Sequence, residues 1–506
     1  MHRAIVTAIV IAVLAACQTD TGGTPPAAET AAAPPPSGAG LPPLEAAKIA
    51  YEKGDYETAW QIFLPRAESG DAVAQVYVSR LYYYGRGHPQ DFTAALRWAR
   101  LAAAQGNAAG RFAVGRMYDT GRGVEKDQAE AARWYLMAAE QGHAGAQYNL
   151  SYLYRQGDGV PADPAAEVRW LKRAAEQGHV EAQYSLAVMH EDGEGVKRDE
   201  AAAAGWYRRA AEQGHTDAQI ALGWLYDSGQ GVAQDHEAAV RWYRKAADKG
   251  SAQAQHNLAI SYYRGEGVPQ SYRQAVRWFR AAAEQGRPGS QASLGHMYRK
   301  GRGVPRDYDA ALRWFHLAAE QDSDMARTEI GHMYRGGEGV TQDYGEAVRW
   351  YREAAGGGDA EAQFALGYSY ERGEGVPPDG AEAVRWYRKA AERGYAPAQF
   401  SLAFAYDNGD GVAQDHAEAA RWYRRAAVQG DAGALNNLAV MYWDGDGVAQ
   451  DRVTALALLN LAAERGSERA ANNRLHYMAK LTAEEILKAE ALTEEWRARI
   501  EGATGS

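Results

Sequence analysis

Closely spaced glycines are the first residues in this sequence that could support chemistry. Motifs such as Gly265-Glu266-Gly267 could cradle a phosphate, because glycine lets backbone N–H groups approach a bound anion. A P-loop would also need Lys and Ser or Thr after its last glycine, and a dinucleotide-binding fold would need a strand before its first. The sequence contains no P-loop motif, and a helix-like segment precedes these glycines. We therefore predict that they form a turn and that the protein has no nucleotide cofactor.

The run Arg-Trp-Tyr-Arg, at residues 241–244 and 385–388, could stack on nucleic-acid bases. The whole chain, however, carries 55 basic and 65 acidic side chains and a net charge of −10. Binding to nucleic acid needs a clustered basic surface that neutralises phosphates. We therefore predict that the tryptophans belong to the core, that the arginines face solvent and that nucleic acid is not a partner.

The 13 histidines are scattered, and only His296 and His332 occupy equivalent places that would make them neighbours. No carboxylate, cysteine or third histidine follows them at ligand spacing, so we predict a binding role for both and no metal site. The sequence also lacks H-E-x-x-H and G-x-S-x-G motifs. We therefore predict no catalytic residues, no cofactor and no enzymatic activity.

The glycine motif recurs every 36 residues, eleven times, from Gly85 to Gly445. A tryptophan series with the same spacing runs from Trp98 to Trp422, and paired alanines occur in every copy. A constant period of this length indicates tandem units that bury their apolar faces against one another. The elements that position every residue discussed so far are therefore the helices of a repeat array.

The sequence of each unit predicts two short helices. Residues 182–190 predict the first helix, because small or apolar residues recur three and four residues apart, and Gly193 ends it. Asp199 begins the second helix by accepting hydrogen bonds from free N–H groups. In four units a glutamate follows this aspartate and predicts a capping box, namely Asp127–Glu130, Asp343–Glu346, Asp379–Glu382 and Asp415–Glu418.

One position of the first helix is always Gly, Ala or Ser, as at Gly223 and Ala259. We expect this small residue to let a neighbouring backbone approach closely, while the leucine, tyrosine and tryptophan of each unit fill the remaining space.

The complete pattern, A-x-A-Q-x-x-L-(small)-x-x-Y-x-x-G-x-G-V-x-x-D-x-x-x-A-x-x-W-x-x-x-A-A-x-x-G, resembles the Sel1-like repeat, a relative of the tetratricopeptide repeat. The resemblance covers eleven copies in residues 71–466. It implies an all-α fold, an α/α solenoid of antiparallel helix pairs wound into a right-handed superhelix. Residues 44–70 resemble a degenerate tetratricopeptide-like first repeat, and residues 467–506 predict capping helices and a tail.

The first 43 residues carry targeting signals. Residues 1–16 contain a basic residue and then a mostly apolar run, which is typical of an export signal peptide. The following Cys17 completes a Leu-Ala-Ala-Cys motif that resembles the bacterial lipobox, so we expect lipidation of Cys17; the alternative is an ordinary signal peptide with an incidental cysteine. Residues 17–43, rich in Pro and Ala, predict a disordered tether. By resemblance to sorting rules, Gln18 favours an outer-membrane lipoprotein that faces the periplasm and touches the membrane only through its lipid.

In tetratricopeptide-like solenoids the first helices line a concave groove that binds partners. The resemblance therefore implies a partner-binding role for thirteen residues, which we call the candidate surface: Phe112, Tyr148, Tyr152, Tyr184, Trp224, His296, Arg299, His332, Arg335, Phe364, Tyr368, Phe400 and Phe404.

Aromatic residues at both ends of this set and basic residues in its middle predict a groove for an extended protein segment that carries acidic residues. We thus expect a non-enzymatic scaffold for protein–protein interaction in the bacterial cell envelope. The alternative is a factor that binds or acts on peptidoglycan or another carbohydrate, because aromatic faces also stack on sugars.

Overall fold

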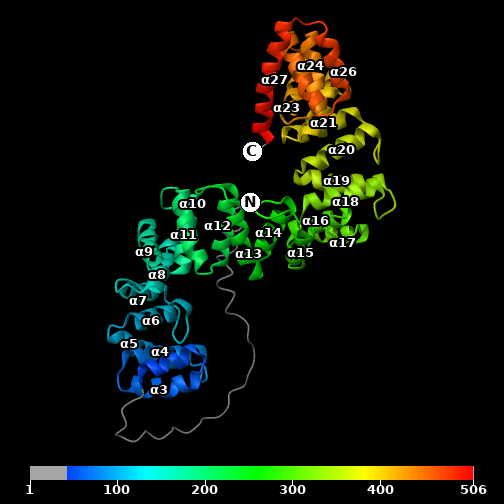
Figure 1. The fold of residues 1–506 in the computed structure, drawn as a ribbon. Coiled ribbons are helices and arrows are strands. Elements are labelled where there is room, and N and C mark those ends of the chain that lie inside the picture. The colour runs from blue at the N-terminus through cyan, green and yellow to red at the C-terminus, as the bar shows by residue number, and fades with distance from the viewer. Residues whose placement is uncertain (1–42, 505–506) are drawn as a thin grey trace. The chain divides into compact units, whose positions relative to one another are not determined.

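The structure, a computed structural model, describes residues 43–504, and every regular element in that range is an α-helix (Figure 1). The predicted signal peptide, Cys17 and the tether up to residue 42 lie outside the described residues. Among the described residues, none of the helices combines the length and the apolar character needed to cross a membrane.

The 26 helices of this described range divide between two compact units. The described part of the first unit, residues 43–141, contains α2 (Leu44–Glu52), α3 (Tyr56–Glu68), α4 (Ala72–Tyr84), α5 (Phe92–Ala104), α6 (Ala108–Thr120) and α7 (Gln128–Ala139).

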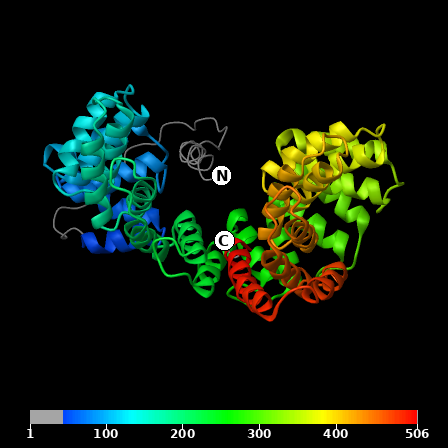
Figure 2. The same ribbon diagram turned by 90° about the horizontal axis from the view of Figure 1, so that it is seen from above.

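The second unit begins at Gly142 and contains nine helix pairs followed by two further helices. The first helices of its pairs are α8 (Ala144–Gln156), α10 (Val180–Asp192), α12 (Thr216–Ser228), α14 (Ala252–Arg264), α16 (Pro288–Lys300), α18 (Asp324–Gly336), α20 (Ala360–Arg372), α22 (Ala396–Asn408) and α24 (Ala432–Asp444). The second helices are α9 (Pro164–Glu176), α11 (Glu200–Glu212), α13 (His236–Asp248), α15 (Tyr272–Glu284), α17 (Tyr308–Ala319), α19 (Tyr344–Gly357), α21 (Gly380–Glu392), α23 (His416–Val428) and α25 (Arg452–Glu464). The chain then forms α26 (Glu468–Met478) and α27 (Ala483–Thr504), which lie at the red end of the ribbon (Figure 2). Both helices pack on α25.

The two glycines of the repeated motif have different structural roles. Gly265 ends α14 in the left-handed conformation, with φ of 80°, and its N–H donates to the carbonyl of Ser261. Gly267 also has a positive φ, of 69°, but its second constraint is space: an added Cβ would overlap the carbonyl of His236 in the preceding repeat. The prediction that these glycines form a turn is confirmed, because both positions need glycine for the backbone path.

In each predicted capping box the aspartate makes its expected hydrogen bond, but the glutamate does not. Asp127 accepts from the N–H of Glu130 at 3.0 Å, as expected of an N-cap. The N–H of Asp127, however, donates to the carbonyl of Tyr118, so the Glu130 carboxylate pairs with Arg133 at 2.7 Å instead. The other three glutamates likewise pair with an arginine three residues on, in Glu346–Arg349, Glu382–Arg385 and Glu418–Arg421. The glutamate half of the prediction is wrong because the first helix already satisfies the cap N–H.

The small residue of the first helix makes room for an aromatic ring rather than for a neighbouring backbone. A Cβ on Gly223 would lie 2.6 Å from the Tyr243 ring, and one on Gly367 would lie 2.7 Å from the Tyr387 ring. Each ring belongs to the second helix of the same repeat and is almost completely buried. The residue directly after the repeat tryptophan is therefore the central core residue.

The tryptophans themselves are mostly half-buried, so their prediction as core residues is only partly right. Trp170, Trp278 and Trp422 are buried, whereas Trp206 and Trp242 remain partly exposed. A cation covers each exposed ring: Arg209 lies 4.3 Å from the Trp206 ring centroid, and Lys245 lies 3.8 Å from that of Trp242. These arginine and lysine side chains shield the rings from water and gain a cation–π contact.

A buried glutamine connects consecutive repeats. Gln183 donates from Nε2 to the carbonyl of Ala175, near the end of the preceding second helix, at 3.1 Å. Its Oε1 accepts from Nε2 of Gln213, at the end of its own repeat's second helix, at 2.8 Å. The Ala175 carbonyl lies in the last turn of α9, where carbonyls have no partner within the helix, and it also accepts from the N–H of Gly178 just after the helix. Because equivalent bonds recur, we call this arrangement the glutamine ladder.

Candidate partner-binding surface

All thirteen residues of the candidate surface lie on first helices. Phe112 belongs to α6 in the first unit, and the other twelve belong to α8, α10, α12, α16, α18, α20 and α22 in the second. Within the second unit, these side chains occupy equivalent positions on the first helices of different repeats. They fall into rings that point toward the next repeat, rings that remain more exposed, and charged residues.

The ring that follows the repeat glutamine packs at the contact between repeats. Tyr184 stacks on His215 with ring centroids 4.4 Å apart and lies 5.7 Å from Tyr207. His215 is also the N-cap of α12, because its Nδ1 accepts from the N–H of Ala218 at 3.1 Å. Phe364 takes the same place between Tyr387 and Tyr395. These rings are half-buried, so part of their aromatic area already stabilises the array.

The ring one helical turn later is the more exposed one. Tyr152 is 39% exposed and Phe404 is 45% exposed, a large fraction for aromatic side chains. Phe404 stacks with Phe400 on the same helix, with ring centroids 6.4 Å apart. One repeat earlier, Tyr368 lies under Arg335, whose guanidinium carbon is 4.5 Å from the ring centroid. At the aromatic end of the candidate surface, in α20 and α22, Phe404 is thus the ring most open to solvent.

The basic middle of the candidate surface is neutralised by glutamates of the following repeat. His296 Nδ1 lies 3.0 Å from Glu329, and Arg299 pairs with Glu329 as well as with Glu338, the latter at 2.5 Å. His296 and Arg299 of the predicted basic middle therefore already have glutamate partners within the array. The sequence analysis missed these glutamate partners because they lie about one repeat further along the chain. Their offset from His296 and Arg299 is close to the 36-residue period, so the sequence did contain a signal for the pairing.

The next repeat has the same arrangement. His332 Nε2 lies 3.1 Å from Glu361 and its Nδ1 lies 2.8 Å from the Tyr351 hydroxyl, while Arg335 pairs with Glu374 at 2.9 Å. Together the two histidines, the two arginines and their glutamates link α16, α18 and α20. This part of the surface is better described as an inter-repeat ion-pair ladder than as a basic groove.

Glu329 is the most strongly perturbed carboxyl group of this ladder. Burial alone would raise its pKa, but the hydrogen bond from His296 and the charge of Arg299 outweigh burial and lower the pKa to about 2. Burial alone would lower the pKa of Arg299, but the hydrogen bond to Glu338 and the charges of Glu329 and Glu338 hold it above its usual value. Both groups are therefore ionised at neutral pH, and neither offers an acid or base for catalysis.

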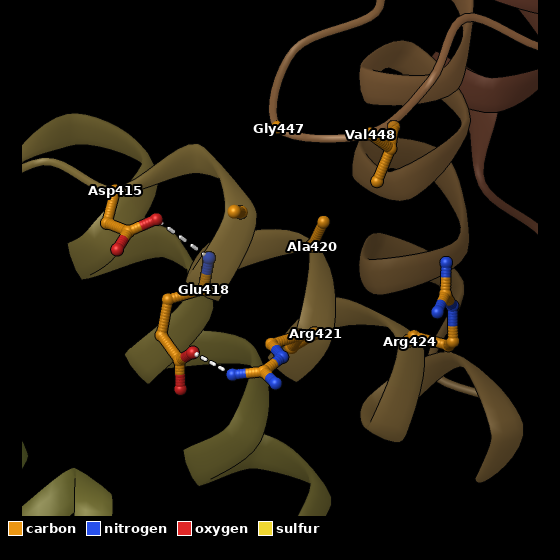
Figure 3. Close-up of a pocket in the computed structure, with 8 residues that line it drawn as sticks. Asp415, Glu418, Ala420, Arg421, Arg424, Gly447 and Val448 are labelled. Carbon is orange, nitrogen blue, oxygen red and sulfur yellow. Dashed lines mark hydrogen bonds and ion pairs between the residues drawn. The ribbon is translucent and has the colours of Figure 1, made fainter.

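A shallow pocket lies away from the candidate surface, where α23 meets the loop of the next repeat (Figure 3). Its lining side chains already have structural partners: Asp415 caps α23 at the N–H of Glu418, and Glu418 pairs with Arg421 at 3.0 Å. Gly447 and Val448 supply the opposite wall. This combination of cap, ion pair and glycine loop belongs to the architecture of the repeat.

Comparisons with known proteins agree with this architecture. Eleven consecutive stretches, from residues 72–107 to residues 432–467, match the model of the Sel1 repeat. The crystal structure of c5321, a protective antigen present in uropathogenic Escherichia coli strains and displaying an SLR fold, shares 36% sequence identity and a TM-score of 0.68, and the match covers 91% of this chain and 96% of that chain. A Sel1 repeat protein from Oxalobacter formigenes is 38% identical over 61% of this chain and 89% of its own, with a TM-score of 0.49. No curated protein matches the chain.

Proposed function

Since this chain belongs to the Sel1 repeat family, we propose that it is a non-enzymatic scaffold that holds a partner protein along the first helices of its second unit. A repeat scaffold recognises its partner by presenting side chains at regular intervals on a rigid stack. Here the regular positions hold aromatic rings, which are the residue types that dominate binding energy at protein interfaces.

The observation that carries this proposal is the exposed ring of Phe404 at the aromatic end of the candidate surface. Phe404 exposes nearly half of its surface, whereas rings on the second helices such as Tyr387 and Tyr423 are buried. Phe400 stacks with it on α22, and Tyr368 holds the equivalent position on α20. Because the neighbouring cations are already paired with glutamates, this end favours a partner segment with apolar or aromatic anchors over a strongly acidic one.

A photo-crosslinking amino acid at position 404, introduced into the full chain in intact cells, tests the proposal. The control places the same amino acid at Arg421, on second helix α23, whose side chain is 77% exposed. We expect discrete protein adducts at position 404 that are absent at position 421, and loss of these adducts when Tyr368 and Phe400 are both replaced by Ala. Adducts of equal pattern at both positions would contradict a binding role for this surface, and adducts with peptidoglycan alone would favour a carbohydrate partner.

The cellular setting of the scaffold is a separate part of the proposal. The lipobox-like motif at Cys17 supports attachment to a bacterial membrane, with the repeats displayed in the periplasm. Cell fractionation of a Cys17→Ser variant should then move the protein from the membrane fraction to the soluble fraction. Unchanged membrane association would exclude lipidation of Cys17 as the anchor.

A further inference from the structure

A histidine and two carboxylates from three separate segments of the second unit meet away from the candidate surface. Asp227 lies in the last turn of α12, His236 is the first residue of α13, and Glu266 stands between the two glycines after α14. Ligand atoms of the three side chains, one from each, all lie within 4.8 Å of one another. His236 Nδ1 is 2.7 Å from Asp227 Oδ1, and all three residues are partly buried.

The charges at this place differ from those at the equivalent places of three other repeats. The last turn of a first helix faces the middle residue of the next Gly-x-Gly motif, 39 residues later. In those three repeats of the second unit the two positions form complementary pairs, namely Arg155–Glu194, Arg299–Glu338 and Arg335–Glu374. Asp227 and Glu266 instead place two acids opposite each other.

Two facing carboxylates repel each other unless a cation lies near them. The cation nearest to Glu266 is Arg264, at 3.6 Å, but its side chain is 61% exposed and such exposed pairs contribute little. His236 is the remaining group between the acids. Either a proton on His236 or a metal ion bound by all three side chains can compensate their charge.

We propose that Asp227, His236 and Glu266 bind one divalent transition-metal ion of the Zn²⁺ type. Imidazole nitrogen and carboxylate oxygen are both established ligands of Zn²⁺, with bonds of roughly 2.0–2.2 Å. The ligand atoms lie within 4.8 Å of one another, so the side chains would have to rotate inward to bind one such ion together. Three protein ligands leave a fourth position for water, or for a donor atom of a partner protein.

The chain contains an internal comparison for this site. Five repeats later, Asp407 and His416 form the same pair, at 2.9 Å, and Asp446 stands where the first site has Glu266. An added Cβ on Gly447 would overlap the His416 carbonyl, just as one on Gly267 would overlap that of His236, so the loops approach in the same way. The aspartate is one methylene shorter, and we infer that it leaves the second copy without its third ligand.

Metal titration of the full chain tests the site, in a Cys17→Ser background that removes the only thiol. Zn²⁺ binding is followed by calorimetry, and Co²⁺ binding by its visible absorption, which reports the geometry of the ligands. We expect one tight equivalent in this background protein. His236→Ala and Glu266→Gln should each weaken binding by at least about 10–100-fold, whereas the matched variant His416→Ala should leave it unchanged. Circular dichroism establishes that the variants keep their helicity.

A gain-of-binding variant makes the test stricter. Asp446→Glu should complete the second copy and raise the stoichiometry from one equivalent to two. Absence of metal binding by the background protein, or equal binding by the His236→Ala and Glu266→Gln variants, would overturn the proposal. A stoichiometry unchanged by Asp446→Glu would contradict the role assigned to the longer carboxylate.

Discussion

Glu329 is the residue at which the repeats of the ion-pair ladder converge. It accepts from His296 and Arg299 of the preceding repeat, and its side chain is largely buried. A buried carboxylate held in this way stabilises the folded state only while it is ionised, because protonation removes its attraction to both partners. Glu329 therefore binds two residues of the candidate surface and also contributes to the stability of the folded array.

Acid should remove this contribution in a defined pH range. The pKa of Glu329 is lowered to about 2 in the folded protein, against roughly 4.3 in an unfolded chain. Its contribution is then complete above the unfolded pKa and is lost as the pH falls toward the folded pKa. We expect Glu329→Gln to lower the free energy of unfolding by roughly 2–3 kcal/mol at pH 7 and to show less loss of stability on acidification than the wild type.

Urea unfolding of both proteins at neutral pH and at a pH between these two pKa values measures the effect. Glu284→Gln, at an exposed position of α15, is the control. It should leave the free energy of unfolding unchanged at both pH values. The difference in free energy of unfolding between Glu329→Gln and wild type should become smaller on acidification. If it stays the same, Glu329 contributes through packing rather than through its charge.

At the level of elements, the glutamine ladder determines how one helix pair joins the next. Its interruption at Gln363 is informative. Gln363 donates to the Ala355 carbonyl as expected, but its buried Oε1 has no hydrogen-bond partner among the described residues. The donor position of this repeat holds Arg393, whereas the following repeat has Gln429, which donates to Gln399 at 2.8 Å.

We predict that Arg393→Gln stabilises the protein. The new side chain should donate to Gln363 Oε1, and satisfying a buried acceptor is worth about 1 kcal/mol. The converse change, Gln429→Arg, should leave Gln399 Oε1 without its donor and destabilise by a similar amount. Hydrogen exchange of the helices that flank each contact measures both changes, and a loss of protection in Arg393→Gln would contradict the prediction.

At the scale of the whole molecule, each helix pair is stabilised mainly by its two neighbours, so the array should tolerate removal of one complete repeat. Residues 180–215 form one matched repeat, and the residues before and at its end, His179 and His215, are both N-caps of first helices. After this deletion His179 would precede α12 and take over the cap of His215. We expect the shortened chain to keep its helicity per residue.

Far-UV circular dichroism and urea unfolding of the deletion variant check this expectation. Removal of residues 180–197 is the matched control, because it deletes α10 and leaves α11 without the first helix of its repeat. The control should lose stability or aggregate. Equal behaviour of the two deletions would show that the stack does not depend on complete helix pairs.

Much of the fold could be predicted before any contact was known. The 36-residue period predicts the helix pairs. Gly193 predicts the end of a first helix and Asp199 predicts the start of a second helix, and the structure confirms all three predictions. These features depend on backbone conformation and on hydrogen bonds within a few residues of chain, which neighbouring residue types largely determine. The candidate surface could be assigned to the first helices for the same reason.

Only the tertiary structure decided which side chains meet across repeats. It placed Glu329 against His296 and Arg299, made the ring at Tyr243 more buried than Trp242, and brought Glu266 to the Asp227–His236 pair. Contacts at offsets of 30 to 39 residues depend on the exact packing of adjacent helix pairs, and several residues within one period can occupy the same neighbourhood. A period therefore determines the architecture of this protein, while charge pairing, burial and the meeting of Asp227, His236 and Glu266 follow from the three-dimensional register of its repeats.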